Sequence, residues 1–157
     1  MKIIQGERVG RLGSVLVGCA AVVFAPDDPA RERILLTRRA DNGRWCLPGG
    51  RLEAGERVAE ACLRELREET GLEGRILRLI GVYSNHDFLL EYADGNRYHL
   101  VSLCFAVAAT GGVLQLSDET TEYGYFTRAQ IATMDLLETH RERIADAFAG
   151  RAETTIQ

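Results

Sequence analysis

Hydrophobic and polar residues alternate along this chain in short blocks, most of which have the length and composition of β-strands. Residues 14–25 are mostly apolar and rich in valine, residues 33–39 read RILLTRR, and residues 98–108 are again mostly apolar. Runs of this length between glycine, proline, asparagine and aspartate residues predict strands. Further strands or turns are expected at 45–47, 75–92, 94–96 (a hairpin turn) and 123–126.

One segment, residues 57–70, has the features of a helix. It contains neither proline nor glycine, and Gly71 follows it, a residue suited to the left-handed position just past a helix end. Later helices are expected after Thr127 or Thr139, either of which can cap a helix, and the last runs to about residue 149. Strands therefore predominate around one central and one terminal helix. This predicts a mixed sheet covered by helices on both faces.

The helix carries acidic residues where apolar ones are expected. Turned through about 100° per residue, its apolar line continues into Glu65 and Glu69, and Glu68 lies on the same side. A buried carboxylate is costly unless it is paired or binds a cation. A solvated acidic face is the alternative, and it fits Glu60 and Arg67 on the opposite side better. Since Mg²⁺ and similar hard cations prefer oxygen ligands, we interpret the three glutamates as a cradle for Mg²⁺ or Mn²⁺.

The stretch from Gly50 to Leu72, GRLEAGERVAEACLRELREETGL, resembles the signature of the Nudix hydrolases and fills each of its fixed positions. The approach to it, LLTRRADNGRWCLPGGRLEAGE, is also similar to the family, as is the later segment 119–126. Tyr125 departs from the tryptophan that is common there. The resemblance covers roughly residues 15–131 and implies the α-β-α sandwich of the family, an α/β (α+β) fold with a central mixed β-sheet.

The resemblance also implies an activity and a set of site residues. Nudix hydrolases cleave nucleoside diphosphates linked to another moiety, and they use a divalent cation. An ion pair between Arg64 and Glu56 is expected to hold the loop to the helix. The implied metal ligands are Glu65, Glu68, Glu69 and the backbone carbonyl of Gly49, with the glycines allowing close approach of the backbone.

Two further pairs of residues are weaker candidates. A carboxylate must accept a proton from the attacking water, and Glu119 or Glu122 is a candidate beside a helix glutamate that the metal leaves free. The alternative is that both lie in a solvated loop. Arg38 and Arg39 end a strand near the glycine loop and are candidates to bind phosphate, although arginines at strand ends often serve solubility alone. None of the three histidines is assigned a role.

Composition fits a small metal-dependent enzyme. The chain has 157 residues and a formal net charge of −4, which predicts a single domain, 1–157, with loose ends at about residues 1–13 and 151–157. No basic run suggests a nucleic-acid groove. An acidic protein that acts on an anionic phosphate needs bridging cations, which agrees with metal dependence. The resemblance makes a homodimer possible, but no segment of this sequence establishes an interface.

Cysteine usage and hydropathy bear on the compartment. The apolar segment before Cys19 imitates a lipoprotein cleavage site, but at about six residues it is short for an export signal. No stretch approaches the ~20 apolar residues of a membrane helix. C-x-x-C pairs are absent, so we expect a cytoplasmic protein with reduced, partly buried thiols at Cys19, Cys46, Cys62 and Cys104.

Three functions are compatible with these features. The favoured one is hydrolysis of ADP-ribose or a nucleotide sugar to a nucleoside monophosphate and a phosphorylated remainder, with an oxidised (d)NTP as the second substrate class. A non-catalytic nucleotide-binding module is the alternative, but such modules typically lose metal glutamates and this chain keeps all three. An acidic protein-interaction surface would leave Glu65 and Glu69 on the apolar line unexplained.

Overall fold

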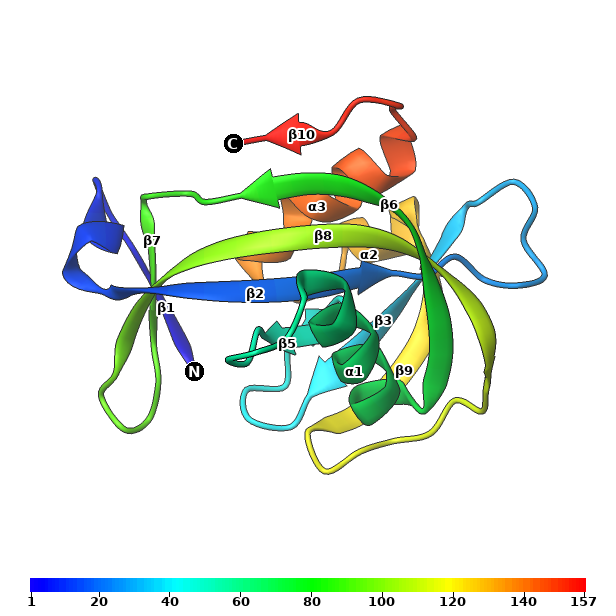
Figure 1. Cartoon of the computed structure of the whole chain (residues 1–157), viewed down its shortest axis with the longest axis horizontal. Coiled ribbons are helices and arrows are strands. Elements are labelled where there is room, and N and C mark those ends of the chain that lie inside the picture. The colour runs from blue at the N-terminus through cyan, green and yellow to red at the C-terminus, as the bar shows by residue number, and fades with distance from the viewer.

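A computed structural model describes the whole chain, residues 1–157, as two β-sheets and three α-helices (Figure 1). The helices are α1 (Val58–Thr70), α2 (Arg128–Ala132) and α3 (Glu138–Ala149), preceded by a 3₁₀ helix at Val9–Leu12. The strands are β1 (Lys2–Gln5), β2 (Ser14–Val22), β3 (Arg33–Arg39), β4 (Trp45–Cys46), β5 (Gly49–Arg51), β6 (Leu72–Tyr83), β7 (Phe88–Glu91), β8 (Arg97–Gly112), β9 (Thr120–Thr127) and β10 (Thr155–Ile156).

The larger sheet is mixed, as the sequence predicted. Its strands follow the order β1-β7-β8-β2-β5, and the long strand β8 also pairs with β6, which in turn pairs with β10. Strand β2 runs parallel to β8, whereas β5, β6 and β7 pair antiparallel with their neighbours. The smaller sheet is antiparallel, in the order β4-β3-β9. No helix is both long and apolar enough to cross a membrane.

Helices pack on both faces of the sheets. Strand β2 shows this, because successive side chains of a strand point to opposite faces. On β2, Ala20 belongs to a buried cluster that includes Ile144 of α3, whereas Ala21 belongs to a second cluster that includes Cys62 of α1. In Figure 1, α1 lies in front of β2 and β5, and α3 lies behind the sheet. Strand β2 is thus apolar on both sides, which explains its near-continuous hydrophobic run.

Most of the expected elements occur where the sequence placed them. Strand β3 has the expected bounds, and the segment 75–92 contains the second part of β6 and all of β7. Thr127 caps α2 by accepting a hydrogen bond from the N–H of Gln130. Thr139 does not cap α3, which begins one residue earlier after Leu137.

The two ends of the chain, expected to be loose, are paired to the large sheet. Strand β1 pairs antiparallel with β7, with Lys2 opposite Glu91. Strand β10 pairs parallel with β6, with Thr155 opposite Gly81. Both strands are short and mostly exposed, so no hydrophobic pattern marks them. Backbone hydrogen bonds to a neighbouring strand hold them in place.

Candidate active site

Helix α1 carries the acidic residues and is fixed at both ends. At its start, the N–H of Arg57 donates a hydrogen bond of 2.8 Å to the Glu60 carboxylate. At its end, Gly71 adopts a φ of 74°, and its N–H donates to the carbonyl of Arg67. The buried side of the helix packs on the sheet through Ala61, Cys62 and Leu66.

Two of the three glutamates lie against strand β5, Glu69 buried and Glu65 partly buried. Glu69 is only 6% exposed, and its Oε2 accepts a hydrogen bond of 2.9 Å from the N–H of Gly49. Burial raises the pKa of Glu69 to about 7, although this bond opposes the shift. The Glu65 carboxylate lies against Gly50, where a Cβ atom would be 2.4 Å from it. Glu68, by contrast, is largely exposed.

Arg64 joins the acidic residues to the preceding loop. Its guanidinium donates two hydrogen bonds to Glu56, of 2.7 and 3.0 Å, and one to the carbonyl of Arg51. Its Nη1 also donates to Glu65 at 2.9 Å and to Glu68 at 3.1 Å. The hydrogen bond from Arg64 lowers the pKa of Glu56 to about 2. The ion pair expected between Arg64 and Glu56 is therefore present.

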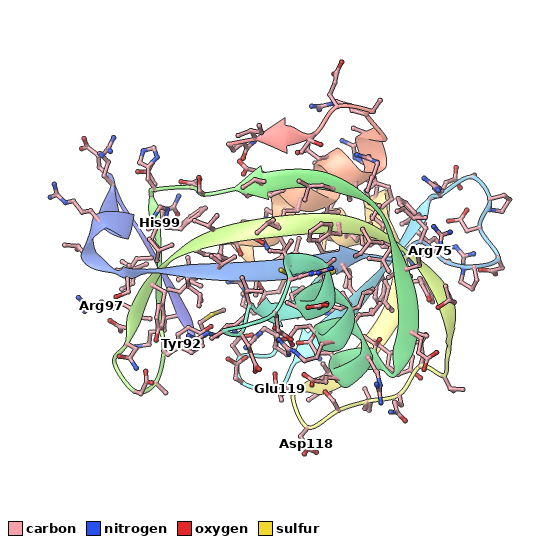
Figure 2. The ribbon with its side chains drawn as sticks, in the orientation of Figure 1. Arg75, Tyr92, Arg97, His99, Asp118 and Glu119 are labelled. Atoms are coloured by element: carbon pink, nitrogen blue, oxygen red, sulfur yellow. The ribbon has the colours of Figure 1, made fainter.

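The two candidate proton acceptors differ in their surroundings. Glu119 precedes β9, and Figure 2 shows it on the side of the molecule where α1 lies. Its charge contributes to the raised pKa of both Glu65 and Glu69, in which burial has the larger part. Glu122 instead accepts a hydrogen bond from Nη1 of Arg38 across the small sheet. Glu119 is thus the carboxylate electrostatically coupled to the helix glutamates.

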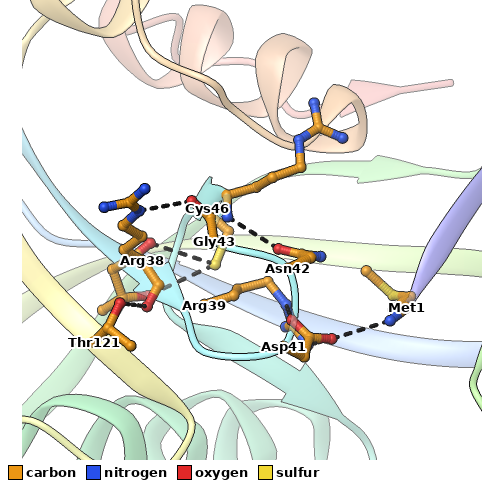
Figure 3. A network of polar contacts seen from close by, with 10 residues as sticks. Met1, Arg38, Arg39, Asp41, Asn42, Gly43, Cys46 and Thr121 are labelled. Atoms are coloured by element: carbon orange, nitrogen blue, oxygen red, sulfur yellow. Dashed lines mark hydrogen bonds and ion pairs between the residues drawn. The ribbon is translucent and has the colours of Figure 1, made fainter.

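The two candidate arginines on β3, Arg38 and Arg39, have different hydrogen-bond partners (Figure 3). Arg39 donates two hydrogen bonds to Asp41, of 2.8 and 3.0 Å, which lower the pKa of that carboxyl. Asp41 accepts a third bond from the α-amino group of Met1. Arg38 donates to the carbonyl of Gly43. Arg39 lines a cavity that also includes Gly49 and Gly50 of β5, whereas Arg38 does not.

A cavity extends from the glycine strand toward α3. It has a volume of about 90 Å³ and is open to the solvent. Its lining includes Gly49 and Gly50 of β5, and His140 and Arg143 of α3. No aspartate or glutamate lines it, although Arg39 and other cationic residues do. The cavity is therefore suited to an anionic ligand.

Comparison with known proteins agrees with the motif. The sequence model described as the NUDIX domain matches residues 17–148. The chain belongs to the Nudix hydrolase family. The family and the sandwich fold that the sequence predicted are thereby confirmed.

Relatives of this Nudix protein have several names. It is 40% identical over 98 residues to an ADP-ribose pyrophosphatase of Methanocaldococcus jannaschii, an alignment that covers 60% of this chain and only 54% of that relative. It is 35% identical to a MutT-like protein of Streptomyces ambofaciens, over 85% of this chain and 77% of that one. A crystal structure of UDP-X diphosphatase superposes with a TM-score of 0.72 at 25% identity, covering 91% of this chain and 68% of that structure.

Nudix hydrolases generally use divalent metals, and the donor set of α1 fits such an ion. Carboxylate oxygens are the ligands that hard cations prefer, and a cation would offset the burial of Glu65 and Glu69. As arranged here, no three histidine, cysteine, aspartate or glutamate side chains converge closely enough to hold a metal. Instead, Nη1 of Arg64 donates hydrogen bonds to both Glu65 and Glu68. The Gly49 carbonyl stays a prediction, since the contact seen is through the Gly49 N–H.

Two residues of the Nudix cavity were not identified from the sequence. His140 accepts the N–H of Leu47 on Nδ1 at 3.1 Å, which leaves its proton on Nε2, and burial lowers its pKa well below the usual value. Arg143 is buried. The signal that could have identified them is the one used for Glu65 and Glu69, a polar or charged residue on the apolar face of a helix. His140 and Arg143 share a helix face with the apolar Ile144 and Ala147.

Proposed function

We propose that this Nudix protein is a Mg²⁺- or Mn²⁺-dependent hydrolase of a nucleoside diphosphate linked to another moiety. It cleaves the pyrophosphate to give a nucleoside monophosphate and a phosphorylated remainder. The observation that carries this proposal is the placement of two carboxylates, the partly buried Glu65 and the buried Glu69, against the glycines of β5, which line a cavity together with cationic residues. Water attack on a phosphate needs charge neutralisation and positioning, and this site has residues suited to both.

Each residue has a distinct part in the proposed reaction. A metal held by Glu65, Glu68 and Glu69 would neutralise charge on the phosphate oxygens and acidify the attacking water. Arg64 positions the side chains of Glu65 and Glu68. Glu119 accepts the proton of the water, because its charge acts on Glu65 of the acidic helix and, unlike Glu122, it is not paired with Arg38. Arg39 contributes positive charge to the cavity wall.

ADP-ribose and nucleotide sugars are the first substrates to test. The name of the Methanocaldococcus relative supports ADP-ribose, and the likeness to UDP-X diphosphatase supports a nucleotide-linked group in general. Oxidised nucleoside triphosphates are the second expectation. A cytoplasmic location agrees with the four free cysteines, since disulfides are rare in reducing compartments.

The test is hydrolysis of a substrate panel by the purified protein with Mg²⁺ or Mn²⁺, and with a chelator as control. The panel contains ADP-ribose, nucleotide sugars, dinucleoside polyphosphates, and ordinary and oxidised nucleoside triphosphates. Glu68→Gln should lose metal-dependent cleavage, whereas Glu60→Gln, on the opposite side of the same helix, should keep it. Tight binding of one compound without turnover would replace the hydrolase with a nucleotide-binding module.

A further inference from the structure

Arg143 of α3 is a buried cation without a polar partner. The residue is 3% exposed, and its Nε has no hydrogen-bond partner. Its guanidinium carbon lies 5.8 Å from the centroid of the Tyr83 ring, which is an interaction with an aromatic face rather than with an acid. Burial lowers its pKa. A buried charge without a counter-charge is costly, so a structural role alone does not account for it.

The acidic residues of α3 do not neutralise Arg143. Asp146, one turn along the helix, accepts a hydrogen bond of 2.8 Å from the Tyr83 hydroxyl and lies 3.6 Å from Nη2 of Arg151. Glu142 is exposed on the adjacent side of the helix. Arg143 instead lines the cavity described above, together with Gly49 and Gly50.

The surroundings of Arg143 favour a negatively charged ligand group. His140, with its proton on Nε2, offers a second donor in the same cavity. Leu90 and Leu100 add apolar wall to this cavity, and no carboxylate lines it; Glu142 lines a second pocket beside Arg143 but makes no hydrogen bond or ion pair with its guanidinium. Arginine binds a carboxylate or a phosphate through two parallel hydrogen bonds, and such bonds strengthen when water is excluded.

We propose that Arg143 binds a second negative charge of the substrate, a carboxylate or a phosphate on the part of the molecule that enters the cavity. This inference rests on the proposed function, which places the pyrophosphate beside the glycines of β5, and it narrows the substrate class. The preferred substrate is then a nucleotide-linked compound with an acid group in addition to its pyrophosphate. An uncharged sugar in the same place leaves the guanidinium unpartnered.

Matched ligand pairs test the inference without requiring turnover. UDP-glucuronate and UDP-glucose differ by one carboxylate, and ADP-ribose 2′-phosphate and ADP-ribose differ by one phosphate. Their binding is measured by calorimetry in the presence of a chelator, on the wild type, on Arg143→Met, and on Arg51→Met as a control. Arg51 lines the same cavity but is exposed, with its guanidinium over Tyr98.

In at least one pair, the wild type should bind the acidic member about tenfold more tightly or better. Arg143→Met should abolish that preference without lowering the melting temperature, because it removes an unpartnered buried charge. Arg51→Met should keep it. The pair that responds identifies the acid as carboxylate or phosphate. The inference is overturned if neither pair shows a preference, if the preference persists in Arg143→Met, or if that variant only loses stability. Arg143-dependent binding without hydrolysis of any compound would refute the proposed hydrolase and not this inference.

Discussion

The backbone N–H of Gly49 donates a hydrogen bond of 2.9 Å to Oε2 of Glu69, and this bond joins strand β5 to the last turn of α1. It holds a carboxylate at a position where only 6% of the residue is exposed. A carboxylate in such a place is stabilised by donors or by a cation, and one backbone donor compensates it only in part. Strand and helix therefore meet at an acidic group that retains capacity for a positively charged ligand.

Replacing Glu69 by glutamine should separate stability from activity. The amide keeps the shape of the side chain and can still accept the Gly49 N–H, but it removes a buried negative charge. We expect the free energy of unfolding to be unchanged or raised by up to about 1 kcal/mol. The metal-dependent rate should fall at least about 100-fold, because a charged ligand of the cation is lost. Urea unfolding and steady-state kinetics check both. A large loss of stability would instead make Glu69 a structural residue.

The two glycines of β5 should respond differently to alanine. At Gly50 the atoms nearest to an added Cβ belong to the carboxylate of Glu65, the end of a flexible side chain that can move, so the protein should fold while kcat falls by about tenfold or more. At Gly49 a Cβ would lie 2.2 Å from the carbonyl oxygen of Cys19, and the φ of 155° is unfavourable for alanine. That variant should lose about 1–3 kcal/mol of stability. Melting temperature and kcat of both variants decide. Full activity of Gly50→Ala would show that the position of Glu65 is not important.

Glu119 and Glu122 give a matched test of the proton acceptor. Glu119→Gln should lower kcat by about 100-fold, which is typical of the loss of a general base, with little change in KM. Glu122→Gln removes only an ion pair with Arg38 between half-exposed side chains, so kcat should stay within about twofold. Kinetics on a substrate chosen from the panel, over a range of pH, compares them. Equal rates for both variants would return the role to a helix glutamate.

The acidic candidate site could be predicted from the sequence because the signals there are local. A helix without a breaker, a terminal glycine and carboxylates on an apolar line all lie within residues 57–71, so no long-range contact was needed to find them. The same holds for β2 and β3, whose apolar runs reflect burial between helices. These elements could be predicted because each is specified by the pattern of its own residues.

The remaining features depend on contacts between distant segments. Strands β1 and β10 exist because the edges of β7 and β6 offer backbone hydrogen bonds, and four or fewer residues carry no periodic pattern. Glu119 and Glu122 differ in their surroundings because Arg38 of β3 pairs with Glu122 of β9, a contact between distant segments. Arg143 lies 74 residues after Glu69 in the chain, and only the fold brings its helix to the cavity that begins at Gly49.

The ion pair of Glu56 with Arg64 should make stability depend on acid pH. The Arg64 hydrogen bond lowers the pKa of Glu56 in the folded protein from 4.5 to about 2. A lowered folded-state pKa stabilises the protein above the unfolded-state value, and the contribution is lost as the pH falls from about 4.5 to about 2. Glu56→Gln should therefore melt below the wild type at pH 7, and the gap should close across that range. A gap for Glu56→Gln that is the same at pH 7 and pH 2.5 would show that the loop is held by packing and not by this charge.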